Sequence, residues 1–187
     1  AETGMDAVPP SPDTAPPSPA AAAAVAALRD RGWTLGTAES LTAGLLAATV
    51  AEVPGASAVL RGGLVVYATA LKHELADVPT DVLERHGAVS PETARALATG
   101  AARRCGAEVG VGLTGVAGPD TQECRPVGTV YVGLTTPDRA AWSVPLSLSG
   151  GRSAIRRAAC ESALALVVAA AGGDTGGDDG DGNESGN

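Results

Sequence analysis

The chain has 187 residues, enough for one domain with a buried core, and its apolar residues are mostly Ala, Val and Leu. Its formal charge is −8, but eight acidic residues lie in residues 1–18 and 172–187, which contain no Lys or Arg. The remaining thirteen acids balance the thirteen basic residues, so the central part is formally neutral. A neutral centre with two Trp, two Tyr and no Phe lacks the charge and the stacking groups typical of nucleic-acid-binding domains.

The cysteines and the chain start indicate a cytoplasmic protein that is not bound to a membrane. Cys105, Cys124 and Cys160 are odd in number and lack C-x-x-C spacing, which favours reduced thiols, and Cys124 has no predicted base beside it. Residues 1–18 are rich in Pro and acids, unlike a secretory leader, and residues 20–28 are too short to cross a bilayer. No His, Cys and carboxylate cluster has metal-ligand spacing, so we expect no metal and no cofactor.

Helices are expected at 19–31, 45–50, 69–75, 79–86, from 91 to about 104, and 152–170, and strands at 33–38, 60–68, 108–113, 128–135 and 140–148. The composition of residues 1–18 and 172–187 predicts disordered tails, so the folded domain should span 19–171, with no second domain before it. Strands that alternate with helices and then form a hairpin predict a three-layer α/β/α fold with a mixed, mostly parallel sheet.

Ser40 is the first candidate for a nucleophile. It lies in the sequence T-A-E-S-L-T-A-G (37–44), between a predicted buried strand and a helix of small apolar residues. Helix starts expose backbone N–H groups and suit an anion, or an oxygen that becomes one. A serine also needs a base, but the two histidines, His73 and His86, fall on predicted surface helices and are expected to be structural.

Lys72 is the candidate base, because it is the only lysine beside twelve arginines. A buried lysine can lose its proton whereas arginine cannot, which makes lysine usable as a general base. Arg-rich coding with one stray surface lysine explains the composition equally well. Thr69, three residues before Lys72, gives a weak S-x-x-K arrangement and ranks below Ser40 as a nucleophile.

Polar or glycine-containing loops follow three predicted strands. Tyr67 ends one strand, and the loop 114–120 with Gly115 and Gly118 follows another; its backbone N–H groups could bind a phosphate or an oxyanion, or it is a plain loop. Arg152 starts the last helix and is either a partner for an anionic group or a surface arginine. Three such loops favour a cleft at one edge of the sheet.

Several ordered motifs together resemble the CinA C-terminal domain family over residues 20 to 171. They are T-A-E-S-L-T-A-G (37–44), residues 63–72 with their Tyr and Lys, H-G-A-V-S (86–90), T-G-V-A-G-P-D (114–120), P-V-G-T-V (126–130) and G-R-S-A-I-R-R (151–157). The characterised enzymes of this family are nicotinamide-mononucleotide amidohydrolases. The resemblance therefore implies hydrolysis of the carboxamide of nicotinamide mononucleotide to nicotinate mononucleotide and ammonia, for NAD recycling.

The same resemblance implies roles for individual residues. Ser40 matches the serine nucleophile and Lys72 the general base, with backbone N–H groups of the Ser40 turn holding the oxyanion. With the loops above, it predicts a set of substrate-binding residues: Glu39, Thr42, Gly44, Tyr67, Thr69, Thr114, Gly115, Gly118 and Arg152. The expected partner is a small nucleotide, with no direct nucleic acid and no membrane, and the expected assembly is a homodimer.

Two departures from the family pattern bear on the site. Residues 42–44 read T-A-G where T-G-G is usual, a change that should be tolerated, and residues 121–125 replace a glycine-rich insert, which could alter specificity or loop order. Two other functions stay open: an amidase of another substrate, and a non-catalytic interaction protein linked to competence or DNA damage.

Overall fold

The computed structural model describes residues 16–173, so the predicted tails fall almost entirely outside the described residues. The strands are β1 (Leu35–Glu39), β2 (Leu60–Val65), β3 (Val109–Gly115), β4 (Thr129–Thr136) and β5 (Arg139–Ser147). The helices are α1 (Pro19–Arg31), α2 (Leu45–Ala51), the short 3-10 helix η1 (Ala56–Ala58), α3 (Thr69–Glu74), α4 (Thr80–His86), α5 (Pro91–Cys105) and α6 (Arg152–Gly172).

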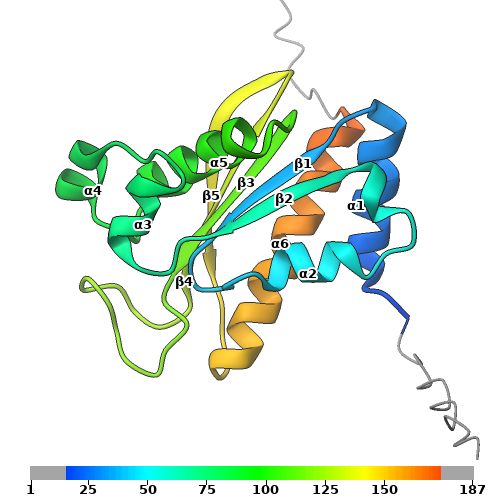
Figure 1. The fold of residues 1–187 in the computed structure, drawn as a ribbon. Helices are drawn as coiled ribbons and strands as arrows, with labels where there is room; N and C mark the ends of the chain where they lie inside the picture. The colour runs from blue at the N-terminus through cyan, green and yellow to red at the C-terminus, as the bar shows by residue number, and fades with distance from the viewer. Residues whose placement is uncertain (1–15, 174–187) are drawn as a thin grey trace, which may run out of the picture.

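The predicted three-layer α/β fold with a mixed sheet is confirmed. The strands lie in the order β2-β1-β3-β4-β5. β1 pairs in parallel with β2 and β3, whereas the hairpin of β4 and β5 continues the sheet antiparallel from β3. α5 packs on one face, with α3 and α4 beside it, and α1, α2 and α6 cover the other (Figure 1). Within residues 16–173, no helix is long and apolar enough to cross a membrane.

The two best-signalled helices start and stop at the residues expected from their sequence. Ser18 caps α1 by accepting a hydrogen bond from the N–H of Ala21 (3.3 Å), and Ser90 caps α5 by accepting one from Thr93 (3.1 Å). Pro at the first helical position and a left-handed glycine after the last helical residue complete both helices.

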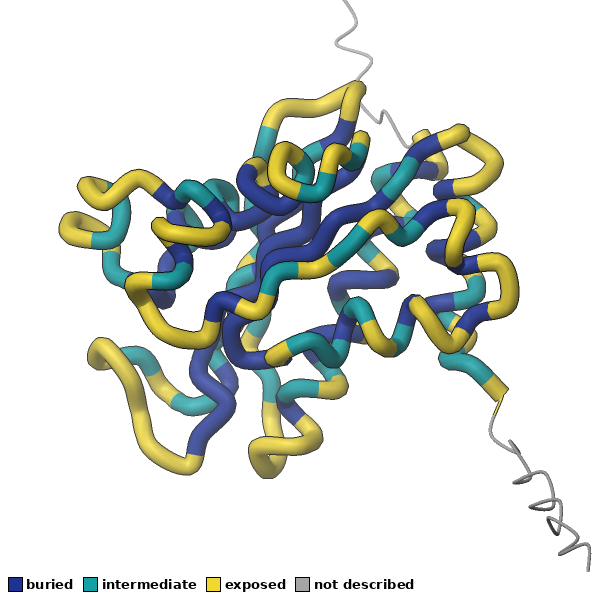
Figure 2. Tube along the Cα trace, in the orientation of Figure 1, coloured by how far each residue is buried: buried dark blue, intermediate teal, exposed yellow. Residues whose placement is uncertain are grey.

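The inner strands β1 and β3 are buried along their whole length (Figure 2). Helix α5 approaches the sheet closely because glycines of the strands face it. A Cβ atom at Gly110 of β3 would lie 1.9 Å from the carbonyl oxygen of Ala98, and one at Gly133 of β4 would lie 1.9 Å from that of Ala94. Helix backbone therefore rests on strand backbone, which leaves no room for a side chain.

Gly110→Ala should lower the free energy of unfolding by about 1–3 kcal/mol, because α5 would have to move away from β3. Gly172→Ala, at the end of α6 where nothing lies within 4 Å of the added Cβ, is the matched control. It should leave stability unchanged or raise it slightly. Urea unfolding checks both variants, and a Gly110→Ala protein as stable as wild type would contradict this packing.

Candidate active site

Three candidate residues meet at the end of the sheet where β1, β2 and β3 finish. Ser40 directly follows β1, Lys72 lies on α3 shortly after β2, and Thr114 lies near the end of β3. A cavity of about 370 Å³ opens between them, beside the start of α6. This volume lies within the range of small-molecule binding sites. Its lining residues are Ser40, Leu41, Tyr67, Lys72, Ala88, Val89, residues 114–122 and Arg152.

The amine of Lys72 is buried, with 1% of the residue exposed. Its Nζ lies 2.9 Å from the carbonyl oxygen of Val66, 3.2 Å from that of Tyr67 and 3.1 Å from Oγ of Ser40. Burial lowers the pKa of Lys72 to about 8, against a smaller opposing effect of the negative charge of Glu123. A sizeable share of the amine is therefore neutral near pH 8.

The three partners of Nζ suit a neutral amine that acts on Ser40. A neutral amine has two N–H groups and one lone pair, and the carbonyl oxygens of Val66 and Tyr67 accept hydrogen bonds from the two N–H groups. The third direction faces Oγ of Ser40, so the lone pair can accept the hydroxyl proton. In the protonated state, the third N–H donates to that oxygen instead.

Hydrogen bonds from two elements fix the turn that carries Ser40. Its N–H donates to the carbonyl oxygen of Leu113 on β3 (2.9 Å), so this group, one of those expected to hold the oxyanion, is already engaged. From α6, Arg156 donates through Nε to the carbonyl oxygen of Leu41 and through Nη2 to that of Thr42, both at 2.9 Å. Within residues 16–173 the N–H of Leu41, on the cavity wall, makes no hydrogen bond.

The start of the helix after Ser40 is occupied by a side chain of the protein, which corrects the expectation of a free anion site there. Glu39 is 1% exposed, and its carboxylate accepts hydrogen bonds from the N–H groups of Leu46 (2.8 Å) and Ala47 (3.1 Å). The hydroxyl of Thr37 donates to the same carboxylate (3.2 Å). Glu39 therefore joins the end of β1 to the start of α2 and stabilises the Ser40 turn between them.

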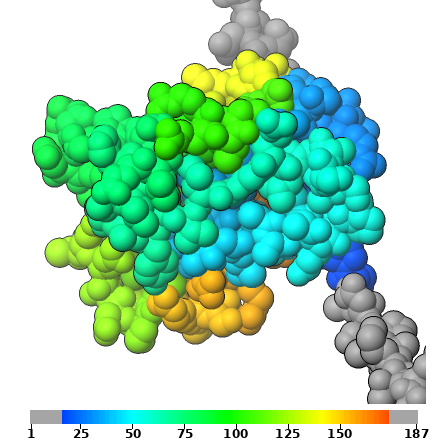
Figure 3. All heavy atoms as spheres, in the orientation of Figure 1, coloured from blue at the N-terminus to red at the C-terminus, as the bar shows by residue number. Residues whose placement is uncertain are grey.

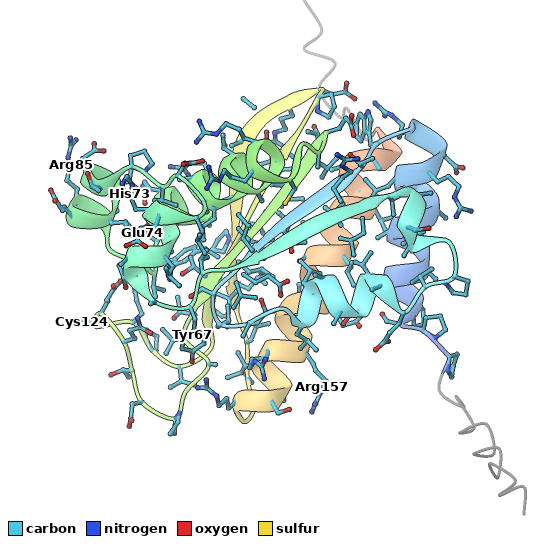
Figure 4. The ribbon with its side chains drawn as sticks, in the orientation of Figure 1. Tyr67, His73, Glu74, Arg85, Cys124 and Arg157 are labelled. Carbon is cyan, nitrogen blue, oxygen red and sulfur yellow. The ribbon has the colours of Figure 1, made fainter. Side chains whose placement is uncertain are left out.

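Arg152 links two parts of the cavity wall, the loop at Gly118 and the side chain of Tyr67. Arg152 donates to the carbonyl oxygen of Gly118 (2.6 Å) and to the hydroxyl of Tyr67 (2.7 Å). Tyr67 is 55% exposed and lies at the same edge of the molecule as the loop that carries Cys124 (Figure 4). A guanidinium and a phenol are thus presented at the mouth of the cavity.

Seven of the eleven predicted site residues line this cavity and four do not. Those that line it are Ser40, Lys72, Tyr67, Thr114, Gly115, Gly118 and Arg152. Glu39 and Thr42 are buried beneath the turn, and Gly44 caps α2 with φ 94°. Thr69 lines a separate surface depression between α3 and α4. The structure therefore does not bring Glu39, Thr42, Gly44 or Thr69 to the cavity.

Sequence reasoning gave no site role to Arg156, Ala88 or Val89, although they lie in the motifs 151–157 and 86–90 that carry the family resemblance. Arg156 lies one helical turn after Arg152, and this i,i+4 spacing was a usable signal. Ala88 and Val89 carry no chemical signal, because they contribute backbone and small side chains to the wall. Neither histidine lines the cavity: His73 Nδ1 lies 2.8 Å from the carbonyl oxygen of Val78, and His86 lies 3.7 Å from Glu92.

A metal ion has no evident place among residues 16–173, since no group of three or more His, Cys, Asp or Glu is arranged to hold one. The cavity wall presents the hydroxyl of Ser40 and the buried amine of Lys72 side by side, with Tyr67, Asp120 and Arg152 as its other charged or titratable side chains.

Comparison with known proteins gives one consistent result. Residues 18–171 match the model of the CinA C-terminal domain. A CinA-like protein of Frankia casuarinae is 49% identical over 140 residues, which are 75% of this chain and 32% of that protein. A competence-damage inducible protein of Limosilactobacillus reuteri is 45% identical over 142 residues, 75% of this chain and 34% of that protein. The aligned part is thus about a third of the length of these relatives.

Solved structures agree with this result. A competence-damaged protein (CinA) superfamily protein from Klebsiella pneumoniae superimposes with a TM-score of 0.79 at 28% identity, over 82% of this chain and 96% of that one. A competence/damage inducible protein from Agrobacterium tumefaciens gives a TM-score of 0.76 at 34% identity, over 80% of this chain and 92% of that one.

The pKa of Lys72 can be measured directly, because a protein labelled with ¹³C at lysine gives the side-chain signals of one residue. We expect the folded protein to titrate at about 8, since burial disfavours the charged amine. The urea-unfolded protein is the control and should titrate near the ordinary value of about 10.4. A folded-state value near 10 would contradict a buried amine poised to act as a base.

Proposed function

This chain belongs to the CinA C-terminal domain family, and we propose that it hydrolyses the carboxamide of nicotinamide mononucleotide through an acyl-serine intermediate. The observation that carries the proposal is the contact of 3.1 Å between Nζ of Lys72 and Oγ of Ser40, at the wall of the cavity. A buried amine with a pKa lowered to about 8 is suited to take up and return a proton at the working pH.

The proposed reaction has two halves. Neutral Lys72 takes the proton of Ser40 as Oγ bonds to the carboxamide carbon. The resulting ammonium of Lys72 then protonates the amide nitrogen, the C–N bond breaks, and ammonia leaves. Water attacks the acyl-serine while Lys72 takes its proton, and the return of that proton to Oγ restores Ser40 and releases nicotinate mononucleotide.

Two further parts of the cavity suit this substrate. The N–H of Leu41 is unengaged in the described chain and adjoins the nucleophile, so it is the candidate donor to the oxyanion. At the mouth, Arg152 is a candidate partner for the phosphate, and Tyr67 offers an exposed ring and a hydroxyl to the nucleotide.

We expect wild-type protein to release ammonia from nicotinamide mononucleotide and Ser40→Ala to lose turnover by about a thousandfold or more. Ser57→Ala, an exposed serine on η1 outside the cavity, is the matched control and should keep full activity. Circular dichroism checks that all three proteins are folded. Equal turnover in wild type and Ser40→Ala would show that another group is the nucleophile.

Lys72 is tested with two substitutions that remove the base in different ways. Lys72→Arg keeps the positive charge but cannot act as a base, and Lys72→Met keeps the length without the charge; both should lose activity by about a thousandfold. In wild type, kcat/KM should rise with pH through about 8, as Lys72 loses its proton. An active Lys72→Arg variant would overturn the base assignment, and a wild type without turnover would overturn the substrate.

A further inference from the structure

The loop of residues 119–125, here called the flap, forms one side of the cavity. Asp120, Thr121 and Gln122 line the cavity, whereas Glu123 and Cys124 form the tip of a tight turn. Gln122 and Arg125 close this turn through two backbone hydrogen bonds, of 3.3 and 2.8 Å. In Figure 3 the flap, in yellow-green, lies against the α3–α4 segment and close to the start of α6.

The backbone of the turn is unfavourable for its residues. Glu123 has φ 50° and Cys124 has φ 58°, so two consecutive residues with side chains adopt the left-handed conformation. Two-residue turns of this kind favour Asn and Gly, since other residues are strained there. Besides the two backbone hydrogen bonds that close the turn, the side chain of Glu123 holds its tip.

The carboxylate of Glu123 binds two successive backbone N–H groups of the opposite wall. Its oxygens accept hydrogen bonds from Ala88 and Val89, each at 3.0 Å. Gly87 makes the approach possible, because a Cβ atom there would lie 2.5 Å from Oε2 of Glu123. The two N–H groups directly follow Gly87, which has φ 79° and ψ 173°, and both donate to the carboxylate of Glu123.

The wall that Glu123 binds is also tied to the rest of the cavity. The carbonyl oxygen of Ala88 accepts a hydrogen bond from Oγ1 of Thr114 (2.6 Å), so one residue is held by β3 through its C=O and by the flap through its N–H. Ala88 and Val89 both line the cavity. The contact of Glu123 thus joins the flap, the Ala88–Val89 wall and the end of β3 into one frame.

We infer that Glu123 is a positioning residue that fastens the flap to the Ala88–Val89 wall and so shapes the cavity around its substrate. Its charge also acts on the catalytic pair, since the carboxylate raises the pKa of Lys72 against the effect of burial. The other charged or titratable side chains on the cavity wall are Tyr67, Asp120 and Arg152. The kinetic consequence rests on the proposed amidohydrolase function, whereas the structural consequence does not.

The test compares Glu123→Gln, which keeps the shape and removes the charge, with Glu123→Asp, which keeps the charge on a shorter side chain. Glu84→Gln, an exposed carboxylate on α4, is the matched control. Hydrogen exchange of the Ala88 and Val89 amides should be at least tenfold faster in both Glu123 variants, because their acceptor is weakened or withdrawn. Exchange rates equal to wild type in both would overturn the inference, whether or not the protein has activity.

Three readouts separate positioning from simple stability. In the lysine-labelled protein, Glu123→Gln should move the pKa of Lys72 below its wild-type value, whereas Glu123→Asp and Glu84→Gln should not. With nicotinamide mononucleotide, KM should rise roughly tenfold in both Glu123 variants, since charge-assisted bonds to the wall are lost. The rising limb of kcat/KM should move to lower pH only in Glu123→Gln. An unchanged KM and an unmoved limb in an active enzyme would contradict the inference.

Discussion

The site depends on the position of one buried amine. Lys72 is removed from solvent, and two backbone carbonyls and one serine hydroxyl surround its Nζ. No carboxylate among the described residues forms an ion pair with it, so burial prevails and its pKa falls to about 8. The carbonyls of Val66 and Tyr67 fix two N–H directions, and the third direction is thereby aimed at Ser40.

The surrounding elements can be understood as supports for this pair. β2 ends at Val65, and the following carbonyls turn toward Lys72 instead of continuing a ladder. Glu39 accepts hydrogen bonds at the start of α2, next to the Ser40 turn. Arg156 of α6 donates to two carbonyl oxygens of that turn. Glu39 and Arg156 thus hold the backbone around Ser40 in place. On one face of the sheet, α5 packs closely against the strands through glycines such as Gly110 and Gly133.

Much of the fold followed from local patterns in the sequence. Ser-Pro starts and glycine stops gave the limits of α1 and α5, and alternation gave the hairpin of β4 and β5. The lone lysine and the strand-end serine were also visible in the sequence. The sequence could not show that the side chain of Glu39 binds the start of α2. A carboxylate next to Ser40 is equally consistent with a contact to substrate. The hydrogen bond between Glu123 and the N–H of Ala88 joins residues 35 positions apart, and only folding brings them together.

The most direct test of an acyl-serine reaction uses hydroxylamine, which competes with water for an acyl-enzyme. With nicotinamide mononucleotide as substrate, the wild type should convert part of it to the hydroxamate, with an equal loss of the acid product, and Ser40→Ala should form neither. Hydroxamate that forms at the expense of the acid, while the total rate of substrate loss stays unchanged, would show that both products come from one acyl intermediate, and its loss in Ser40→Ala would place that intermediate on Ser40. Acid formation at an unchanged rate with no hydroxamate, across a range of hydroxylamine concentrations, would contradict the covalent route and favour direct attack by water.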